Sequence, residues 1–223
     1  MGVWGVWKCG SVEVWEYGSV GVWRCGSMEV YSPFHTPILL LPHPHTPIPI
    51  SMGELILILG GARSGKSQQA QKLAEAHGQK VCYLATCIPG DEEMRQRVLW
   101  HRKNRPSHWK TVEEATEVIP VLEKESLDSE VILLDCLTLF IFNLMEIYPN
   151  ETEVLSQVKR LCETTKKISP TVLVVSNEVG GGIVPENALA RKFRDLAGLA
   201  NQLTAQYADS VYWMVAGIPV KIK

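Results

Sequence analysis

The 223-residue sequence lacks three features that would assign it to a special class of protein. Its 22 Lys and Arg nearly balance 24 Asp and Glu, so no broad basic surface indicates binding to nucleic acid or to an anionic membrane. It has no run of 18 apolar residues, which argues against stable membrane insertion. Its six cysteines include no C-x-x-C pair, which disfavours disulfide and zinc frameworks and favours a reducing, cytoplasmic location. Cys82 and Cys136 fall in apolar runs and are expected to be small buried residues.

Residues 1–51 differ in composition from the rest of the chain. Val-Trp recurs every eight residues, as does Gly-Ser, before a proline-rich stretch at 32–51 that denies the backbone regular hydrogen bonds. A period of eight is far below the ~20–50 residues of the repeats that build solenoids and propellers. We expect this segment to be translated repetitive upstream sequence, unfolded and not native, with the functional protein beginning at Met52. A genuine hairpin-forming or adhesive extension is the alternative.

From Met52 onward, short apolar runs alternate with longer amphipathic stretches. The runs have the length and β-branched composition of strands, and they are 55–59, 81–85, 131–134, 172–175 and 211–215. The stretches of helical length are 67–77, 91–103, 113–123, 152–167 and 186–207. This alternation predicts one α/β domain over residues 52–223, in which helices cover both faces of a mainly parallel, buried sheet. Ligands are then expected at the carboxyl ends of the strands.

The clearest motif follows the first apolar run. Residues 60–67 read Gly-Gly-Ala-Arg-Ser-Gly-Lys-Ser and match G-x-x-x-x-G-K-[ST] in full, between an expected strand and an expected helix. In such a loop the backbone N–H groups and the helix N-terminus surround phosphate. Lys66 would reach the β and γ oxygens, and the Ser67 hydroxyl would bind Mg²⁺. The motif predicts a nucleoside triphosphate site; a glycine-rich turn that merely carries Lys-Ser is the alternative.

A second anchor for Mg²⁺ is expected at the end of another strand. Asp135 directly follows the apolar residues 131–134 and fits that position. The same carboxylate would also serve to cap a helix that begins near Cys136. We favour the metal-linked role because the phosphate loop calls for an acid at this place.

His101 lies near the end of the expected helix 91–103, beside Arg102, Lys103 and Arg105. A lone histidine near a helix end is commonly a surface or capping residue, and these cations fit an ordinary solvated face. The same group also fits covalent nucleotidyl transfer, in which a neutral imidazole attacks the α-phosphorus while cations offset the developing charge. The pattern of residues leaves both interpretations open.

Short blocks of sequence between Leu55 and Lys223 resemble, in the same order, one known family. The blocks are Gly61-Ala62-Arg63-Ser64-Gly65-Lys66-Ser67, Tyr83-Leu84-Ala85-Thr86, Asp91-Glu92-Glu93-Met94, His101-Arg102-Lys103-Asn104-Arg105-Pro106, Asn177-Glu178-Val179-Gly180 and Gly182-Ile183-Val184-Pro185. Together they resemble the bifunctional adenosylcobinamide kinase / adenosylcobinamide-phosphate guanylyltransferase family of cobalamin synthesis. Many NTPases share the first block, whereas those that start at His101 and Asn177 are far more specific. Residues 1–51 have no counterpart in that family.

The resemblance implies a RecA-like P-loop NTPase fold in three layers that carries out two reactions. A nucleoside triphosphate phosphorylates the aminopropanol hydroxyl of adenosylcobinamide. GTP then guanylylates that phosphate through a GMP-histidine intermediate, giving adenosyl-GDP-cobinamide and pyrophosphate. ATP and GTP are the implied substrates, with Mg²⁺ held at Ser67 and Asp135, and the implied assembly is a homo-oligomer, expected to be a trimer. His101 occupies the guanylylated position, and Lys66 is the second catalytic residue.

The resemblance also implies a set of nucleotide contacts. They are Gly61, Ala62, Arg63, Ser64, Gly65, Lys66, Ser67, Gln68, Thr86, Cys87, Ile88, Arg102, Lys103, Asn104, Arg105, Glu113 and Asp135. Trp100 stands where relatives often carry a second histidine, which makes His101 the unambiguous nucleophile. The two transfers need different alignments, so we expect a movable nucleotide or a movable His101 helix with a hinge at Pro106.

Two other functions remain compatible with the residues alone. One is a P-loop kinase acting on another small alcohol, with a structural His101. The other is a RecA-like nucleotide switch or assembly ATPase that works through a protein partner. The three glycines 180–182 favour a flexible or closely approached backbone in the loop 176–187, which we expect to serve substrate recognition or subunit packing.

Overall fold

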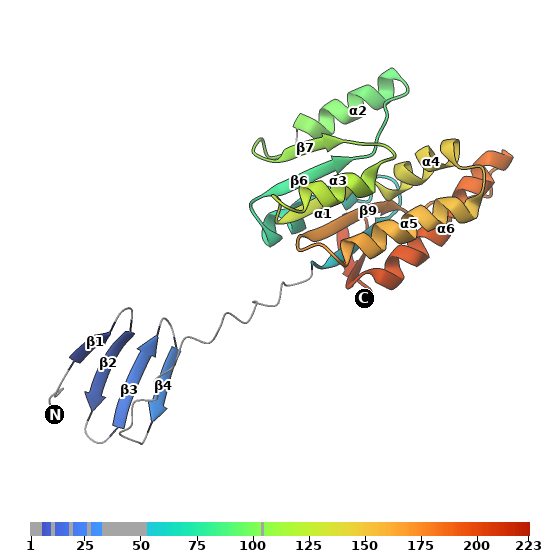
Figure 1. The fold of residues 1–223 in the computed structure, drawn as a ribbon. Helices are drawn as coiled ribbons and strands as arrows, with labels where there is room; N and C mark the ends of the chain where they lie inside the picture. The colour runs from blue at the N-terminus through green and yellow to red at the C-terminus, as the bar shows by residue number, and fades with distance from the viewer. Residues whose placement is uncertain (1–5, 10–11, 18–19, 26–27, 33–52, 104) are drawn as a thin grey trace. The chain divides into compact units, whose positions relative to one another are not determined.

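The computed structural model describes residues 6–9, 12–17, 20–25, 28–32, 53–103 and 105–223, and it divides into the units 1–49 and 50–223 (Figure 1). In the first unit, four antiparallel strands follow the eight-residue repeat; they are β1 (Val6–Cys9), β2 (Val12–Tyr17), β3 (Val20–Cys25) and β4 (Met28–Ser32). The period places Val opposite Trp in neighbouring strands, as at Val14 and Trp23. These strands lie in the segment 1–51, for which a hairpin-forming extension was the alternative interpretation. That residues 1–51 stand apart from the native enzyme stays a prediction.

A seven-stranded sheet forms the centre of the second unit. Its strands are β5 (Leu55–Gly60), β6 (Val81–Ala85), β7 (Lys110–Glu113), β8 (Val131–Asp135), β9 (Thr171–Asn177), β10 (Ser210–Val215) and β11 (Ile218–Lys221). They lie in the order β11-β10-β5-β9-β8-β6-β7, and every neighbouring pair is parallel except β10 with β11. The α/β class and the mainly parallel, buried sheet predicted from the apolar runs are confirmed.

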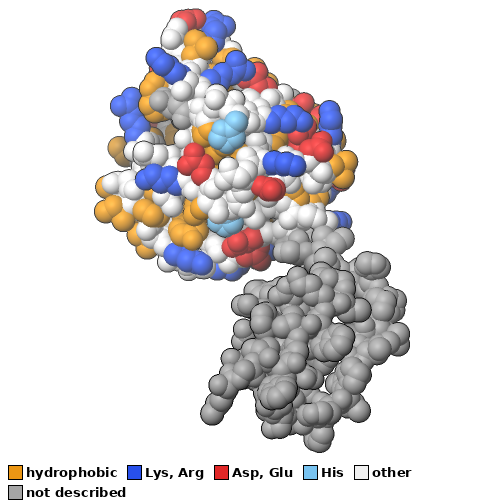
Figure 2. Space-filling model, turned by 90° about the vertical axis from the view of Figure 1, so that its left-hand side faces the viewer, with side chains coloured by type: hydrophobic (Ala, Val, Ile, Leu, Met, Phe, Trp, Pro, Cys, Tyr) orange, Lys and Arg blue, Asp and Glu red, His pale blue; other side chains and the backbone are white. Residues whose placement is uncertain are grey.

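Helices cover both faces of this sheet. They are α1 (Lys66–His77), α2 (Glu92–Lys103), α3 (Val118–Glu125), α4 (Leu137–Ile147), α5 (Glu151–Thr165) and α6 (Ala188–Tyr207). None of the helices in the described part of the chain is both long enough and apolar enough to cross a membrane. Acidic and basic side chains are interspersed on the face of this unit that Figure 2 shows, so that face carries no field of a single sign.

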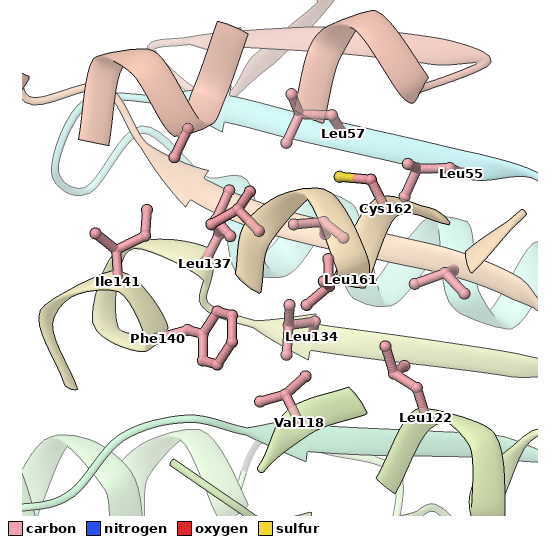
Figure 3. Close-up of a cluster of buried hydrophobic side chains, with 14 of the residues drawn as sticks. Leu55, Leu57, Val118, Leu122, Leu134, Leu137, Phe140, Ile141, Leu161 and Cys162 are labelled. Carbon is pink, nitrogen blue, oxygen red and sulfur yellow. The ribbon is translucent and has the colours of Figure 1, made fainter. Parts of the chain in front are cut away.

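Two hydrophobic clusters fill the space between the layers. Alternate residues of β5 enter opposite clusters because successive strand side chains point to opposite faces. Leu55 and Leu57 join residues of α3, α4, α5 and α6 in the cluster of Figure 3, whereas Ile56 and Ile58 pack with α1. Cys82 and Cys136 are buried in these clusters, as predicted. The domain therefore has three layers.

One expected helix is wrong. The stretch 113–123 was expected to be helical, but Glu113 ends β7, which pairs with β6, and α3 begins only at Val118. The carboxylate of Glu114 accepts hydrogen bonds from the backbone N–H groups of Thr116 and Glu117, each at 2.9 Å, and this turn separates the strand from the helix. The other four expected helices agree with the structure to within two residues at each end.

Candidate active site

The loop that follows β5 depends on glycine at two positions. A Cβ atom on Gly60 would lie 2.6 Å from Ser64 Oγ and 2.8 Å from the Met214 carbonyl oxygen. Gly65 has φ of 93°, in the left-handed region, and a Cβ there would lie 3.2 Å from Gly217 Cα. The Gly217 N–H donates to the Ser64 carbonyl at 3.0 Å, so the turn between β10 and β11 supports the loop from behind.

Replacing Gly65 with alanine is expected to weaken GTP binding by about tenfold. The new methyl group would force both the left-handed backbone and the contact with Gly217 to change, at a cost of about 1–2 kcal/mol. Isothermal titration of the variant with GTP measures the effect. Gly198→Ala is the matched control, because a Cβ on Gly198 meets nothing within 4 Å. Equal GTP affinities for the two variants would contradict the requirement for glycine at 65.

Lys66 is held inside the phosphate loop. Its side chain is only 8% exposed, and Nζ donates a hydrogen bond to the Gly61 carbonyl at 2.6 Å. Burial lowers the pKa of Lys66, and the negative charge of Asp135 partly offsets this effect. Gly65 is the N-cap residue of α1 and supplies no side-chain hydrogen bond to the first N–H groups of that helix. An ammonium group and uncapped helix N–H groups thus face the same loop, which is the arrangement that binds phosphate.

Asp135 ends β8, opposite Ala85 of β6. The Tyr83 hydroxyl donates to Asp135 Oδ2 at 2.7 Å, and the Arg105 guanidinium carbon lies 3.2 Å from the centre of the Tyr83 ring. Burial, followed by the nearby charge of Asp135, raises the pKa of Tyr83, so the phenol stays protonated and remains a donor. Burial also lowers the pKa of Arg105, partly offset by its neighbours Tyr83 and Asp135.

A cleft of about 1290 Å³ joins these groups. The expected site residues that line it are Ala62, Arg63, Ser64, Gly65, Lys66, Ser67, Gln68, Cys87, Arg105, Glu113 and Asp135. Gly61, Thr86, Ile88, Arg102 and Lys103 are not among its lining residues. The structure therefore brings the phosphate loop, Asp135 and part of the basic cluster to one cavity at the carboxyl ends of the strands.

The Thr86 side chain links the ends of β6 and β8 and does not line the cleft. Its fully buried side chain donates to the Cys136 carbonyl at 2.7 Å and accepts from the Cys136 N–H at 2.8 Å. Asn143 of α4 in turn donates to the Thr86 carbonyl at 2.9 Å. These bonds hold the end of β6 against the end of β8.

Thr86→Val is expected to lower the free energy of unfolding by about 2 kcal/mol, because it leaves the buried Cys136 N–H without an acceptor. Urea unfolding followed by circular dichroism measures the change. Thr171→Val makes the same isosteric replacement at the partly exposed start of β9 and serves as the control. A Thr86 variant as stable as this control would show that the Thr86–Cys136 bonds contribute little.

The backbone of His101 lies in the last turn of α2, while its side chain and all of Asn104 fall outside the described residues. Met94, Val98 and Trp100 of the same helix line the cleft. Arg102 forms an ion pair with Glu113, which ties the end of α2 to the end of β7. The expected helix that carries His101 thus borders the same cleft as the loop at 60–67, which is compatible with the predicted nucleotidyl transfer.

Ser67 and Asp135 supply hard oxygen donors at the cleft. Within the described residues, no cluster of three or more His, Cys, Asp or Glu side chains is arranged to hold a metal ion. Mg²⁺ in nucleotide sites needs only one or two protein ligands, because substrate phosphates and water complete its octahedron. The donor set therefore fits Mg²⁺ bound together with a nucleotide.

Several lining residues were missed from the sequence. They are Gln71, Tyr83, Met94, Val98, Trp100 and Leu139. Asn177, Glu178 and Val179 also line the cleft, and they belong to the loop 176–187 that was expected to serve substrate recognition or subunit packing. Tyr83 lies in an apolar run that the sequence interprets only as a buried strand. Its hydroxyl was the available signal, since a buried tyrosine usually requires a hydrogen-bond partner.

Comparison with known proteins gives consistent matches over this unit. The family model described as cobinamide kinase / cobinamide phosphate guanyltransferase matches residues 56–222. The bifunctional adenosylcobalamin biosynthesis protein CobU of Escherichia coli (strain K12) is 40% identical over 181 residues, which covers 76% of this chain and 99% of that protein. The corresponding protein CobP of Pseudomonas aeruginosa is 40% identical over 167 residues, with 75% and 96% covered. CobU of Salmonella typhimurium is 38% identical over 181 residues, with 76% and 99% covered.

These matches include the phosphate loop, α2 and the strand that ends at Asp135, which are the elements that form the cleft. The chain belongs to the cobinamide kinase / cobinamide phosphate guanyltransferase family.

Proposed function

We propose that this chain phosphorylates adenosylcobinamide with a nucleoside triphosphate and then transfers GMP from GTP to the resulting phosphate. The products are adenosyl-GDP-cobinamide and pyrophosphate. The observation that carries this assignment is the single cleft shared by the phosphate loop, Asp135 and the helix that bears His101. Family membership supports both activities.

Phosphoryl transfer in this cleft depends mainly on positioning and on offsetting charge. Lys66 and the first N–H groups of α1 would hold the β- and γ-phosphates. Mg²⁺, when bound at Ser67 and Asp135, would neutralise charge on the same phosphates. The aminopropanol hydroxyl attacks the γ-phosphorus, its proton leaves to solvent or a base, and the bond between the γ-phosphorus and the β,γ-bridging oxygen breaks.

Guanylyl transfer proceeds in two displacements. A neutral nitrogen of His101 attacks the α-phosphorus of GTP, a P–N bond forms, and the bond to the α,β-bridging oxygen breaks to release pyrophosphate. A phosphate oxygen of the corrinoid then attacks the same phosphorus and frees the histidine. Lys66 and Arg105 line the cleft and would offset charge on the departing pyrophosphate.

The γ-phosphoryl transfer and the attack of His101 on the α-phosphorus need different alignments, which supports movement of the nucleotide or of α2 between the two reactions. The cleft of about 1290 Å³ exceeds the roughly 300–1,000 Å³ of common small-molecule sites, so it leaves space for a nucleotide to shift. At the end of α2, the Arg105 N–H donates to the Arg102 carbonyl at 3.3 Å. Pro106 follows directly and is the proposed hinge.

We also infer a cytoplasmic homo-oligomer, expected to be a trimer. The strand β11 ends the sheet with exposed apolar side chains, of which Ile218 is 65% and Val220 46% exposed. An open apolar sheet edge favours association with another copy. Light scattering coupled to size-exclusion chromatography measures the mass; a monomer at micromolar concentration would contradict this inference.

The assigned activity is tested by turnover with the purified chain. Adenosylcobinamide and ATP are expected to give adenosylcobinamide phosphate, and addition of GTP is expected to give adenosyl-GDP-cobinamide, both identified by mass spectrometry. Phosphorylation without GMP transfer would reduce the function to that of a kinase. Absence of both products until a protein partner is added would instead support a nucleotide switch.

A further inference from the structure

Tyr83 contacts both Arg105, in the segment that follows α2, and the carboxylate of Asp135 at the end of β8. It belongs to β6, next to β8, and packs with α1 on the face of the sheet that carries the phosphate loop. Its side chain is 3% exposed, so neither the ring nor the hydroxyl can move freely. Its hydroxyl reaches along this face to Asp135, which the register places one pleat beyond Leu133, the neighbour of Tyr83.

The hydrogen bond from Tyr83 fixes the carboxylate of Asp135. A free aspartate rotates about its last side-chain bond, but the 2.7 Å contact at Oδ2 selects one orientation. With Oδ2 committed to the phenol, Oδ1 is the oxygen available to the cleft. Groups of this kind orient a ligand without touching the substrate, and their loss commonly weakens metal binding by about 10–100-fold.

Arg105 lies over the face of the Tyr83 ring. Its guanidinium carbon lies 3.2 Å from the ring centre, and its Nη1 lies 3.4 Å from Thr111 Oγ1 at the start of β7. Trp109, which is buried in the same cluster as Tyr83, accompanies Arg105 in the segment that joins α2 to β7. A cation over a phenol ring withdraws electron density from it, which makes the O–H a stronger donor.

We propose that Tyr83 is a positioning residue that links the segment following α2, through Arg105, to the carboxylate of Asp135. Any displacement of that segment changes the donor that orients Asp135. The state of the helix carrying His101 is thereby transmitted to the part of the site that holds the β- and γ-phosphates. This inference rests on the proposed role of Asp135 in binding Mg²⁺ with the nucleotide.

The test measures GTP binding as a function of Mg²⁺ concentration, with full-length protein and isothermal titration. Tyr83→Phe keeps the ring under Arg105 and removes only the hydroxyl. We expect it to raise the Mg²⁺ concentration for half-maximal enhancement of GTP binding by about tenfold. GTP binding in EDTA is expected to remain unchanged. Tyr207→Phe is the matched control, because the Tyr207 hydroxyl also donates to a carboxylate, Glu163, at 3.5 Å and neither residue lines the cleft.

Asp135→Asn separates the two ways in which the inference can fail. If this variant leaves the Mg²⁺ dependence unchanged, the proposed role of Asp135 is wrong, and the inference about Tyr83 fails with it. If Asp135→Asn shifts the dependence but Tyr83→Phe behaves like wild type or like Tyr207→Phe, only the role of Tyr83 is wrong.

Arg105→Met tests the link to the segment after α2 without altering the Tyr83 hydroxyl. We expect a shift of about threefold in the Mg²⁺ dependence. Combined with Tyr83→Phe it should add little, because both changes act through one hydrogen bond. Shifts that multiply fully in the double variant would show that Arg105 acts independently of Tyr83. Should Tyr83→Phe fail to fold, a wild-type dependence in Arg105→Met would still overturn the link.

Discussion

His101→Ala is expected to eliminate the covalent GMP adduct and to reduce guanylyl transfer by about 10⁴-fold or more, because the nucleophile is lost. The adduct is measured by incubating the protein with GTP labelled at the α-phosphate and counting the label that stays with the denatured chain. A phosphoramidate to histidine is labile in acid and stable in base, which distinguishes it from a phosphoester on serine. Phosphorylation of adenosylcobinamide should persist, since His101 has no part in the γ-phosphoryl transfer.

His108→Ala is the matched control for this experiment. His108 is an exposed histidine on the connection that follows α2, so its replacement removes a similar side chain close to His101 in the sequence. We expect its adduct level to match that of wild type. Adduct formation by the His101 variant, or its loss in the His108 variant alone, would assign the nucleophile elsewhere.

Lys66→Ala is expected to impair both reactions, by about 10³-fold in kcat and at least tenfold in GTP affinity. Both transfers need the β- and γ-phosphates held in one place, and we propose that Lys66, a buried cation that lines the cleft, holds them. Comparison of steady-state rates for the two reactions tests this, because His101→Ala affects one reaction and Lys66→Ala affects both. Lys66→Arg should not restore activity, since the Lys66 side chain is only 8% exposed and the space around it is too small for the wider guanidinium.

Lys72→Ala provides the control on the same helix. Lys72 is an exposed residue of α1, so its removal tests the general effect of losing one positive charge near the loop. Rates within a factor of two of wild type are expected for it. If Lys66→Ala lost only the phosphoryl transfer, the two reactions would use different phosphate sites, and the single-cleft assignment would be wrong.

The sequence predicts the central strands well because their residues are apolar on both faces. Runs such as 131–134 have no polar side chains that could face water, so a parallel strand buried on both faces is the simplest structure for them. For α4 the sequence indicates only that a helix begins near Cys136, because residues Leu137–Ile147 are apolar on most sides and do not mark where the helix ends. The rule for strands fails at β7, where four mostly exposed residues pair at the edge of the sheet and carry little hydrophobic signal.

Some residues of the candidate site could be predicted from the sequence, and others could not. The phosphate loop is a local motif, so Lys66 and Ser67 could be assigned from spacing alone. Tyr83 and Arg105 act on Asp135 through contacts between segments distant in sequence, which no local pattern encodes. Thr86 was predicted to contact the nucleotide, yet its side chain bonds to the backbone of Cys136, directly after β8. Pairings of this kind depend on strand order, and strand order becomes visible only in the folded sheet.

The hydrogen bond from Gly217 to the phosphate loop can form only near the end of synthesis of this domain. β5 emerges from the ribosome first among the strands of this domain, but both of its neighbours, β9 and β10, are made much later. The carbonyl of Ser64 gains its partner only after Gly217 has been translated. A nascent chain thus carries the complete loop sequence long before it can hold a nucleotide, and GTP can stabilise this domain only once the sheet has closed around β5.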